Sequence, residues 1–174
     1  PNLNGHLIMN LRNPTLPGAT RPTWIQRGLS LSKGIADALD LTQPLAALVA
    51  RAYIAQVFFL SGLTKLRDWG TTVALFTDEY NVPLLPPEVA ALMGTAGELV
   101  LPVLLVLGLG GRFAALGLSV VNVVAVISLS EIAPAALQQH ITWGVLLAAL
   151  AIYGGGKWSI DHLAGAWVRH QMPG

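Results

Sequence analysis

Apolar stretches, each about as long as a bilayer is thick, dominate the sequence between residues 44 and 156. A helix needs ~20 consecutive, mostly apolar residues to cross the hydrocarbon core of a membrane. A helix on the surface of a soluble bundle carries a charged outer face, and these stretches show none. We therefore predict four membrane-spanning helices, which cover residues 45–66, 88–107, 112–129 and 134–153.

The composition favours a membrane protein over the other classes. Of the 174 residues 53% are hydrophobic and 11% are charged, whereas soluble domains carry about 25% charged residues. The sequence contains no cysteine, which excludes a disulfide framework, a cysteine-ligated metal and a cysteine nucleophile. A formal net charge of +1 gives no electrostatic support for a nucleic-acid partner.

The remaining segments complete the predicted domain organisation. Residues 1–22 are polar, rich in Pro, Asn and Thr, and predicted to form a flexible tail. Residues 23–43 place apolar side chains at helical spacing, which predicts an amphipathic helix on the membrane surface; a helix packed on a soluble partner is the alternative. Residues 44–156 form the four-helix domain, which Pro44 opens, and residues 157–174 form a C-terminal tail. The predicted fold class is an all-α integral membrane four-helix bundle with an N-terminal amphipathic interfacial helix.

Basic residues predict the orientation of the bundle. Lysine and arginine gather in the N-terminal segment and the C-terminal tail, whereas the loop between the third and fourth spans carries only Glu131. The positive-inside rule then places both termini in the cytoplasm of a bacterial inner membrane. Lys65 and Arg67 break the rule, because they lie at the outer end of the first span. Snorkelling to headgroup phosphates explains this pair in one interpretation, and a functional role explains it in the other.

Titratable side chains inside the spans are the candidates for catalysis. Glu98 lies near the middle of the second span, where a charged residue costs about 2.5–3.5 kcal/mol, so it must face the protein interior. At ~1.5 Å per residue from the outer boundary, Glu98 is the deepest acid, His140 is shallower and Lys65 lies at the rim. We predict that these three side chains line one cavity that opens outward. An ion pair between Glu98 and Arg51 is the structural alternative, with Lys65 and His140 as competing partners.

Other polar residues of the spans are candidates for binding a cofactor. Trp143 follows His140 by three positions and therefore shares its helix face. Asn122 lies near the middle of the third span, and Gln139 directly precedes His140. The structural alternative for Asn122 is a hydrogen bond between helices, and for Trp143 it is packing in the core or at the membrane interface. His140 is the only histidine inside a span, so a bis-His haem within one chain is excluded and no metal site is predicted.

Three segments taken together indicate a family. The first span reads RAYIAQVFFLSGLTKLRDW, the loop after it contains VPLLPPE, and the second span reads GTAGELVLPVLLVLGLGGRFAAL. This combination resembles the DoxX family of small four-helix membrane proteins, over residues 45–153. It is most similar to members encoded beside peptide-modifying iron enzymes, in clusters for copper-responsive, modified-cysteine peptides. The similarity maps the family's shared positions to Arg51, Gly62, Lys65, Pro83, Glu98, Gly108 and Arg112.

The resemblance implies a redox-linked membrane subunit. DoxX relatives are similar to a subunit of an archaeal thiosulfate:quinone oxidoreductase, and others assemble with soluble sulfur-transfer or superoxide-handling enzymes. In the first hypothesis the outer half of the bundle binds a quinone, with Lys65 or His140 on a carbonyl oxygen. Trp143 stacks on the ring and Glu98 relays a proton. The other candidate cofactor-binding residues are Asn122, Gln139 and Arg67.

Two other functions compete with this hypothesis. In the first, the protein is a membrane anchor for a soluble oxidoreductase or a modified peptide, and the amphipathic helix or the outer loop 71–87 carries the function. In the second, it is a small transporter of metal or modified peptide. A chain of this length encloses only a narrow path, so transport requires an oligomer. The small residues of the spans let helices approach closely, which favours a homo-oligomer.

Overall fold

The computed structural model describes residues 22–171. The chain divides into two units, residues 1–40 and 41–174. The predicted flexible tail lies outside the described residues up to residue 21. The regular elements of the described part are helices joined by short connections: α1 (Thr23–Arg67), α2 (Trp69–Asp78), α3 (Pro87–Leu107), α4 (Gly111–Ser128), α5 (Pro134–Tyr153) and α6 (Ile160–Gln171).

Four of these helices are long and apolar enough to cross a membrane: α1, α3, α4 and α5. Their bounds agree with the predicted spans to within one residue for α3, α4 and α5. The prediction of an all-α membrane bundle is thereby confirmed. Leu92, Phe113 and Val120 are among the many large apolar side chains left exposed on these helices. An apolar surface of this kind is suited to lipid tails.

α1 begins earlier than the first predicted span. The helix continues through Pro44, which lies inside it, so Pro44 is not at the first turn of the helix, and the start of the span at residue 44 remains a prediction. Inside a helix, proline removes one backbone hydrogen bond and its ring crowds the carbonyl of residue i−4, which helices in membranes tolerate when other groups satisfy the freed carbonyl. Residues 23–40, which belong to the first unit, are helical, as predicted for the amphipathic segment. Their placement on the membrane surface remains a prediction.

Two helices lie where the sequence was interpreted as loop or tail. α2 begins after Asp68, whose carboxylate accepts a hydrogen bond from the Thr71 backbone N–H at 3.0 Å. α6 begins after Ser159, whose hydroxyl oxygen accepts the His162 backbone N–H at 3.2 Å. Aspartate and serine are preferred at these capping positions because they satisfy N–H groups that the first helical turn leaves unpaired. The residues from 157 onward therefore form a short connection and a helix, at least as far as Gln171.

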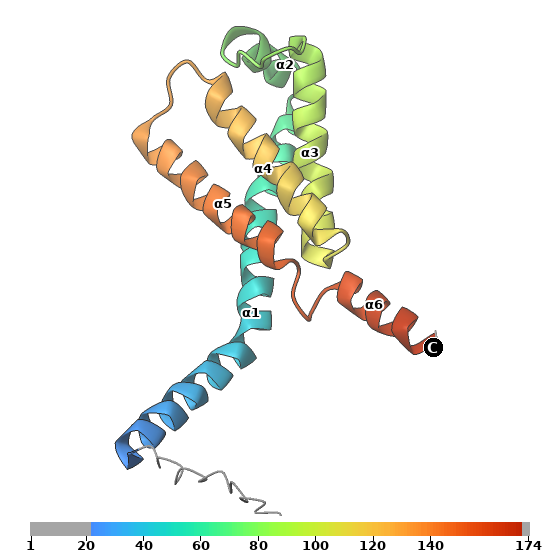
Figure 1. The fold of residues 1–174 in the computed structure, drawn as a ribbon. Helices are drawn as coiled ribbons and strands as arrows, with labels where there is room; N and C mark the ends of the chain where they lie inside the picture. The colour runs from blue at the N-terminus through green and yellow to red at the C-terminus, as the bar shows by residue number, and fades with distance from the viewer. Residues whose placement is uncertain (1–21, 172–174) are drawn as a thin grey trace, which may run out of the picture. The chain divides into compact units, whose positions relative to one another are not determined.

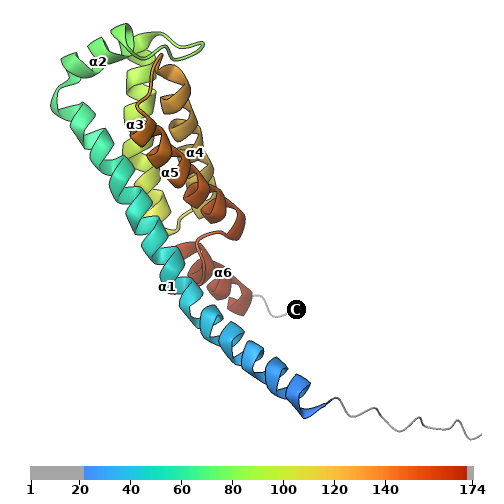
Figure 2. The same cartoon turned by 90° about the vertical axis from the view of Figure 1, so that its left-hand side faces the viewer.

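In the second unit α3, α4 and α5 lie side by side, and α2 lies across the end of the bundle at which α3 begins (Figures 1 and 2). We call this the α2 end. At the opposite end the α3–α4 turn contains Gly108 and Gly110, and the segment after α5 contains Gly154 and Gly156. All four have positive φ, which glycine adopts without a steric penalty. We call this the glycine end; α6 begins there.

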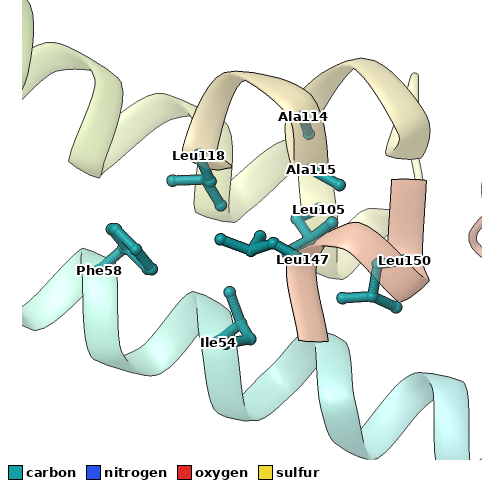
Figure 3. Close-up of a cluster of buried hydrophobic side chains, with 8 residues drawn as sticks. All are labelled: Ile54, Phe58, Leu105, Ala114, Ala115, Leu118, Leu147 and Leu150. Atoms are coloured by element: carbon teal, nitrogen blue, oxygen red, sulfur yellow. The ribbon is translucent and has the colours of Figure 1, made fainter. Parts of the chain in front are cut away.

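One cluster of buried apolar side chains holds the four spanning helices together (Figure 3). Ile54 and Phe58 of α1 face Leu118 of α4 and Leu147 of α5. Small side chains on α4 allow close approach of the neighbouring helices. The members of this cluster are Ile54, Phe58, Leu105, Ala114, Ala115, Leu118, Leu147 and Leu150. The cluster lies between the α2 end and the glycine end, and it therefore separates the polar side chains at one end from those at the other.

Candidate functional site

An ion pair joins α1 to α3 near the α2 end. The Lys65 ammonium Nζ lies 2.6 Å from Oε1 and 2.5 Å from Oε2 of Glu98, and it also donates to the Ser61 hydroxyl at 3.1 Å. The Glu98 side chain is 9% exposed and that of Lys65 is 21% exposed. Both charges are thus largely removed from solvent. Such a pair is stable only because each charge neutralises the other.

Local structure fixes this geometry. Ser61 lies one helical turn before Lys65 on the same face of α1, which orients the lysine side chain. Gly62 lies on the face of α1 toward α3, where a Cβ atom would lie 2.9 Å from Leu99 and 3.1 Å from the Cβ of Glu98. Glycine at position 62 therefore lets α1 and α3 approach closely enough for the pair to form. The Thr72 hydroxyl of α2 donates to the Lys65 carbonyl oxygen at 2.8 Å and ties α2 to the end of α1.

The ion pair forms the charged wall of a mostly apolar cavity of about 390 Å³. α2, α3, α4 and the segment after α2 supply the other walls. Tyr80 and Val82 belong to that segment, which is held to α4 by a hydrogen bond from the Asn81 N–H to the Ser128 carbonyl oxygen at 2.8 Å. The apolar lining includes Phe76, Val82, Pro83, Leu85, Met93, Val120, Val121, Val124 and Ile127.

Tyr80 brings a phenol to the same cavity. Its ring packs on Phe76, with ring centroids 4.9 Å apart. Burial raises the pKa of the Tyr80 phenol, and the negative charges of Glu98 and Glu79 raise it further. The neutral phenol is therefore retained to higher pH than in an exposed tyrosine, and it keeps a proton that it can donate in a hydrogen bond.

Arg51 does not pair with Glu98, which rules out the structural alternative derived from the sequence. Its guanidinium is buried at the glycine end and donates to the Trp158 carbonyl oxygen at 2.7 Å. Longer contacts of 3.4 and 3.5 Å lead to the carbonyl oxygens of Ala47 and Val106. Arg51 lies almost four helical turns from Lys65 along α1, so the two cations serve opposite ends of the bundle.

His140 belongs to a second polar group, between α4 and α5. Its ring Nδ1 lies 2.7 Å from the Asn122 side-chain oxygen, and the Asn122 amide donates to the His140 carbonyl oxygen at 2.9 Å. The Trp143 ring packs edge-on against His140, with centroids 4.9 Å apart, and its N–H donates to the Tyr53 hydroxyl at 3.3 Å. Asn122 thus joins two helices by hydrogen bonds, as its structural interpretation proposed.

The side chains that were predicted to line one cavity therefore fall into two separate groups. Lys65 and Glu98 line the cavity, whereas His140, Asn122 and Trp143 do not. The reason is the position of each side chain around α4. Successive residues of a helix point about 100° apart, so Val121 faces the cavity while Asn122 faces α5. No residue of α5 contributes to the cavity lining.

Two predicted binding residues lie outside both groups. Gln139 and Arg67 have exposed side chains and neither lines the cavity. Within residues 22–171 no group of three or more His, Asp or Glu side chains is placed to hold a metal ion. The sequence interpretation missed Tyr80, Phe76 and Ser61. Only Ser61 gave a signal, because it precedes Lys65 by four residues and hence shares its face.

The fold and this cavity define a class: a small multi-pass membrane protein with a charged pair at the wall of an apolar cavity inside its helical bundle. The chain belongs to the DoxX family, whose sequence profile matches residues 46–131. A Haemophilus influenzae protein described as uncharacterized is 30% identical over 125 residues, which is 67% of this chain and 81% of that protein. No solved structure matches significantly. Residues 46–131, which the family profile matches, include every residue that lines the cavity but neither His140 nor Trp143.

Proposed function

We propose that the cavity beside Lys65 and Glu98 binds the head group of a lipid-soluble quinone, and that the protein is the membrane subunit of a redox system. The observation that supports this most directly is the ion pair at the wall of an apolar cavity inside a membrane bundle. A quinone, when bound, supplies carbonyl oxygens that take up two electrons and two protons. The electrons come from a soluble oxidoreductase partner, as the family resemblance suggests.

The residues present fit such a head group. Small-molecule sites are mostly apolar concavities of about 300–1,000 Å³ with few, well-placed polar groups, and the cavity has about 390 Å³. Its apolar lining suits a ring with short alkyl substituents. Lys65 and Tyr80 carry N–H and O–H donors at its wall, and carbonyl oxygens require donors of this kind.

Each polar residue then has a distinct role in the proposal. Lys65 donates a hydrogen bond from Nζ to a carbonyl oxygen, and Glu98 holds the ammonium in place from the other side. Glu98 is also the buried carboxylate able to take up and pass on a proton. Tyr80 donates its phenolic proton in a second hydrogen bond. Trp143 does not serve as the stacking partner here, because it packs with His140 and Phe58 outside the cavity.

A cavity-filling substitution tests this proposal. Ala125 lines the cavity, whereas Val123 on the same helix does not and is exposed, so Ala125→Phe and Val123→Phe form a matched pair. The full chain is purified in mild detergent, and its organic extract is analysed by mass spectrometry. We expect a stoichiometric quinone with the wild type and Val123→Phe, and its loss from Ala125→Phe. Only bulk phospholipid in every extract, or equal quinone in all three, would contradict the proposal.

A membrane anchor for soluble partners is the second candidate, and one observation favours it. Leu84 is fully exposed and has a φ of 67°, a left-handed conformation that costs a residue with a side chain roughly 1–2 kcal/mol. Strained backbone of this kind concentrates at functional sites. In this alternative a pull-down of the partner is lost with Leu84→Asp but survives removal of Lys65, Glu98 and His140. Retention of the partner by Leu84→Asp would exclude a docking role for Leu84. Loss with the Lys65, Glu98 and His140 variant would exclude an anchor that works without these three residues.

The proposals about the membrane, the orientation of the chain and its wider biological setting come from the sequence. We propose a bacterial inner-membrane location with the glycine end, and both termini, in the cytoplasm, because basic residues concentrate there. The α2 end and the quinone cavity then face outward. Cysteine labelling from outside intact cells at Thr77→Cys and Lys157→Cys tests this orientation; only the first should react. The link to copper-responsive peptide clusters and self-association of the chain also remain predictions.

A further inference from the structure

A second, larger cavity lies at the glycine end, far from the ion pair. It has a volume of about 1000 Å³ and is formed by the start of α4, the end of α5 and the start of α6. Glycine residues make up much of its wall, so that backbone rather than side chains borders the space. Its polar side chains are Arg112, Lys157, Ser159, Asp161 and His162.

The charges of this cavity are unbalanced in favour of cations. Asp161 is its only acid, and the two carboxylate oxygens accept the backbone N–H groups of Gly110 and Gly111 at 3.1 and 3.2 Å. Asp161 thus caps α4 and forms no ion pair with either basic side chain, so one negative charge faces two positive charges. Among the described residues, no ion pair joins Arg112 or Lys157 to a carboxylate of this cavity. Two cations face one cavity, and an anion bound in it would be stabilised by both.

Exposed aromatic side chains surround the same cavity. Phe113 and Tyr153 line it and are 70% and 82% exposed. Trp158 directly follows Lys157 and is also exposed. Tryptophan and tyrosine concentrate at the boundary between hydrocarbon and head groups. Tyr153 ends the spanning helix α5, and Trp158 lies in the connection from α5 to α6. The cavity is therefore at the depth of lipid head groups.

α6 has an exposed apolar face, which is also expected of a helix at the depth of lipid head groups. Ile160, Leu163 and Trp167 follow at spacings of three and four residues, which places them on one face of the helix. All three side chains are exposed, so no described part of the protein covers this face. An amphipathic helix whose apolar face lies at the membrane boundary buries that face among lipid head groups and upper acyl chains.

We propose that this cavity binds the phosphate group of an anionic phospholipid, with α6 lying in the interface beside it. Arg112 and Lys157 donate charge-assisted hydrogen bonds to the phosphate oxygens, and the glycines let the head group approach the backbone. Basic pockets between membrane helices bind anionic head groups by the same chemistry. A soluble phosphate offers the same oxygens, but it has no acyl chains to cover the apolar face of α6. This lipid site shares no residue with the proposed quinone site, so either site can exist without the other.

Lipid retention by the full chain tests the proposal. The detergent-purified protein is titrated with phosphatidylglycerol or with phosphatidylcholine, and bound lipid is counted by native mass spectrometry. We expect phosphatidylglycerol to be retained about tenfold more strongly than phosphatidylcholine, and Arg112→Gln with Lys157→Gln to remove that preference. Arg112→Lys retains the charge and should retain most of the binding. Arg67→Gln, at the α2 end, is the matched control and should leave it unchanged.

Several outcomes would overturn the proposal. Equal retention of the two lipids would show that the cavity does not select a negative head group. An equal loss with Arg67→Gln and Arg112→Gln would show attraction by overall charge and no defined site. Inorganic phosphate that displaces phosphatidylglycerol at equal concentration would identify a site for soluble phosphate. Thermal unfolding of each variant, measured without added lipid, separates lost binding from a lost fold.

Discussion

The ammonium of Lys65 lies 2.6 and 2.5 Å from the two carboxylate oxygens of Glu98, 33 positions further along the chain. The pair joins the end of α1 to the middle of α3 and is the polar wall of the cavity. In the orientation proposed above, the pair gives a reason for a lysine at the outer end of a span, against the usual distribution of positive charge. The carboxylate deep in the bundle needs a cation, and Lys65 supplies it.

Removing one member of the pair is expected to cost more than removing both. Lys65→Met leaves the Glu98 carboxylate unpaired, and Glu98→Leu leaves the ammonium unpaired; each should lower the free energy of unfolding by about 3 kcal/mol. The double variant removes both charges and should recover a large part of that loss. Thermal or denaturant unfolding in detergent measures the cycle. If the double variant lost as much free energy of unfolding as the two single variants together, the two charges would not interact.

The second polar group is expected to affect stability without affecting the cavity. Asn122→Leu removes two hydrogen bonds to His140 and should lower the free energy of unfolding by about 1 kcal/mol. The amount of extracted quinone should equal that of the wild type, because neither residue lines the cavity. Mass spectrometry of the extract decides the point. Loss of the quinone with Asn122→Leu would instead connect the two groups.

Gly108 is expected to tolerate no side chain. Its φ is 68°, and an added Cβ would lie 2.5 Å from the Ser159 Cβ and 2.8 Å from the Arg51 Nη1. Gly108→Ala should therefore lower the free energy of unfolding by at least about 1 kcal/mol. Gly94→Ala is the matched control, since its Cβ would meet the Phe76 ring at an ordinary 3.6 Å. Similar melting temperatures for the two variants would contradict this account.

The start of α2 is expected to loosen in acid. The Thr71 hydroxyl and backbone N–H both donate to the Asp68 carboxylate, and these hydrogen bonds lower the pKa of Asp68. A depressed pKa in the folded state means that the stabilising carboxylate is fully present above the usual aspartate pKa, and is lost as pH falls through the lower folded value. Hydrogen exchange of the α2 amide groups, compared at pH 6 and pH 3, measures the effect. Asp68→Asn retains the cap without titrating, so its α2 amides should show no such acid-dependent loosening once the intrinsic exchange rates are corrected for.

Tyr80 is expected to ionise at higher pH than an exposed tyrosine. Burial and the nearby charges of Glu98 and Glu79 raise its pKa. A pKa raised in the folded state contributes stability below the usual tyrosine value, and that contribution is lost as pH rises through the folded pKa. Absorbance titration of wild type and Tyr80→Phe gives the Tyr80 transition by difference. A transition at the ordinary tyrosine pKa would place the phenol in water, outside the cavity.

The sequence by itself determined the spans. A helix in a bilayer satisfies its own backbone hydrogen bonds, and the bilayer sets its length; both conditions are visible in hydropathy alone. α3, α4 and α5 accordingly begin and end within one residue of their predicted bounds. α2 and α6 were missed because both, at 10 and 12 residues, are too short to cross a bilayer, so hydropathy over the length of a span does not detect them. Their caps at Asp68 and Ser159 were the readable signals.

Only the tertiary structure decided which polar groups meet. Depth along a span follows from counting residues, and it left Arg51, Lys65 and His140 as competing partners for Glu98. The choice depends on how each helix is rotated about its own axis, since a step of one residue turns a side chain by about 100°. Packing around Gly62 brings Lys65 against Glu98, while Asn122 turns away from the cavity and binds His140. Rotation is set by side-chain packing between helices, and no single span contains that information.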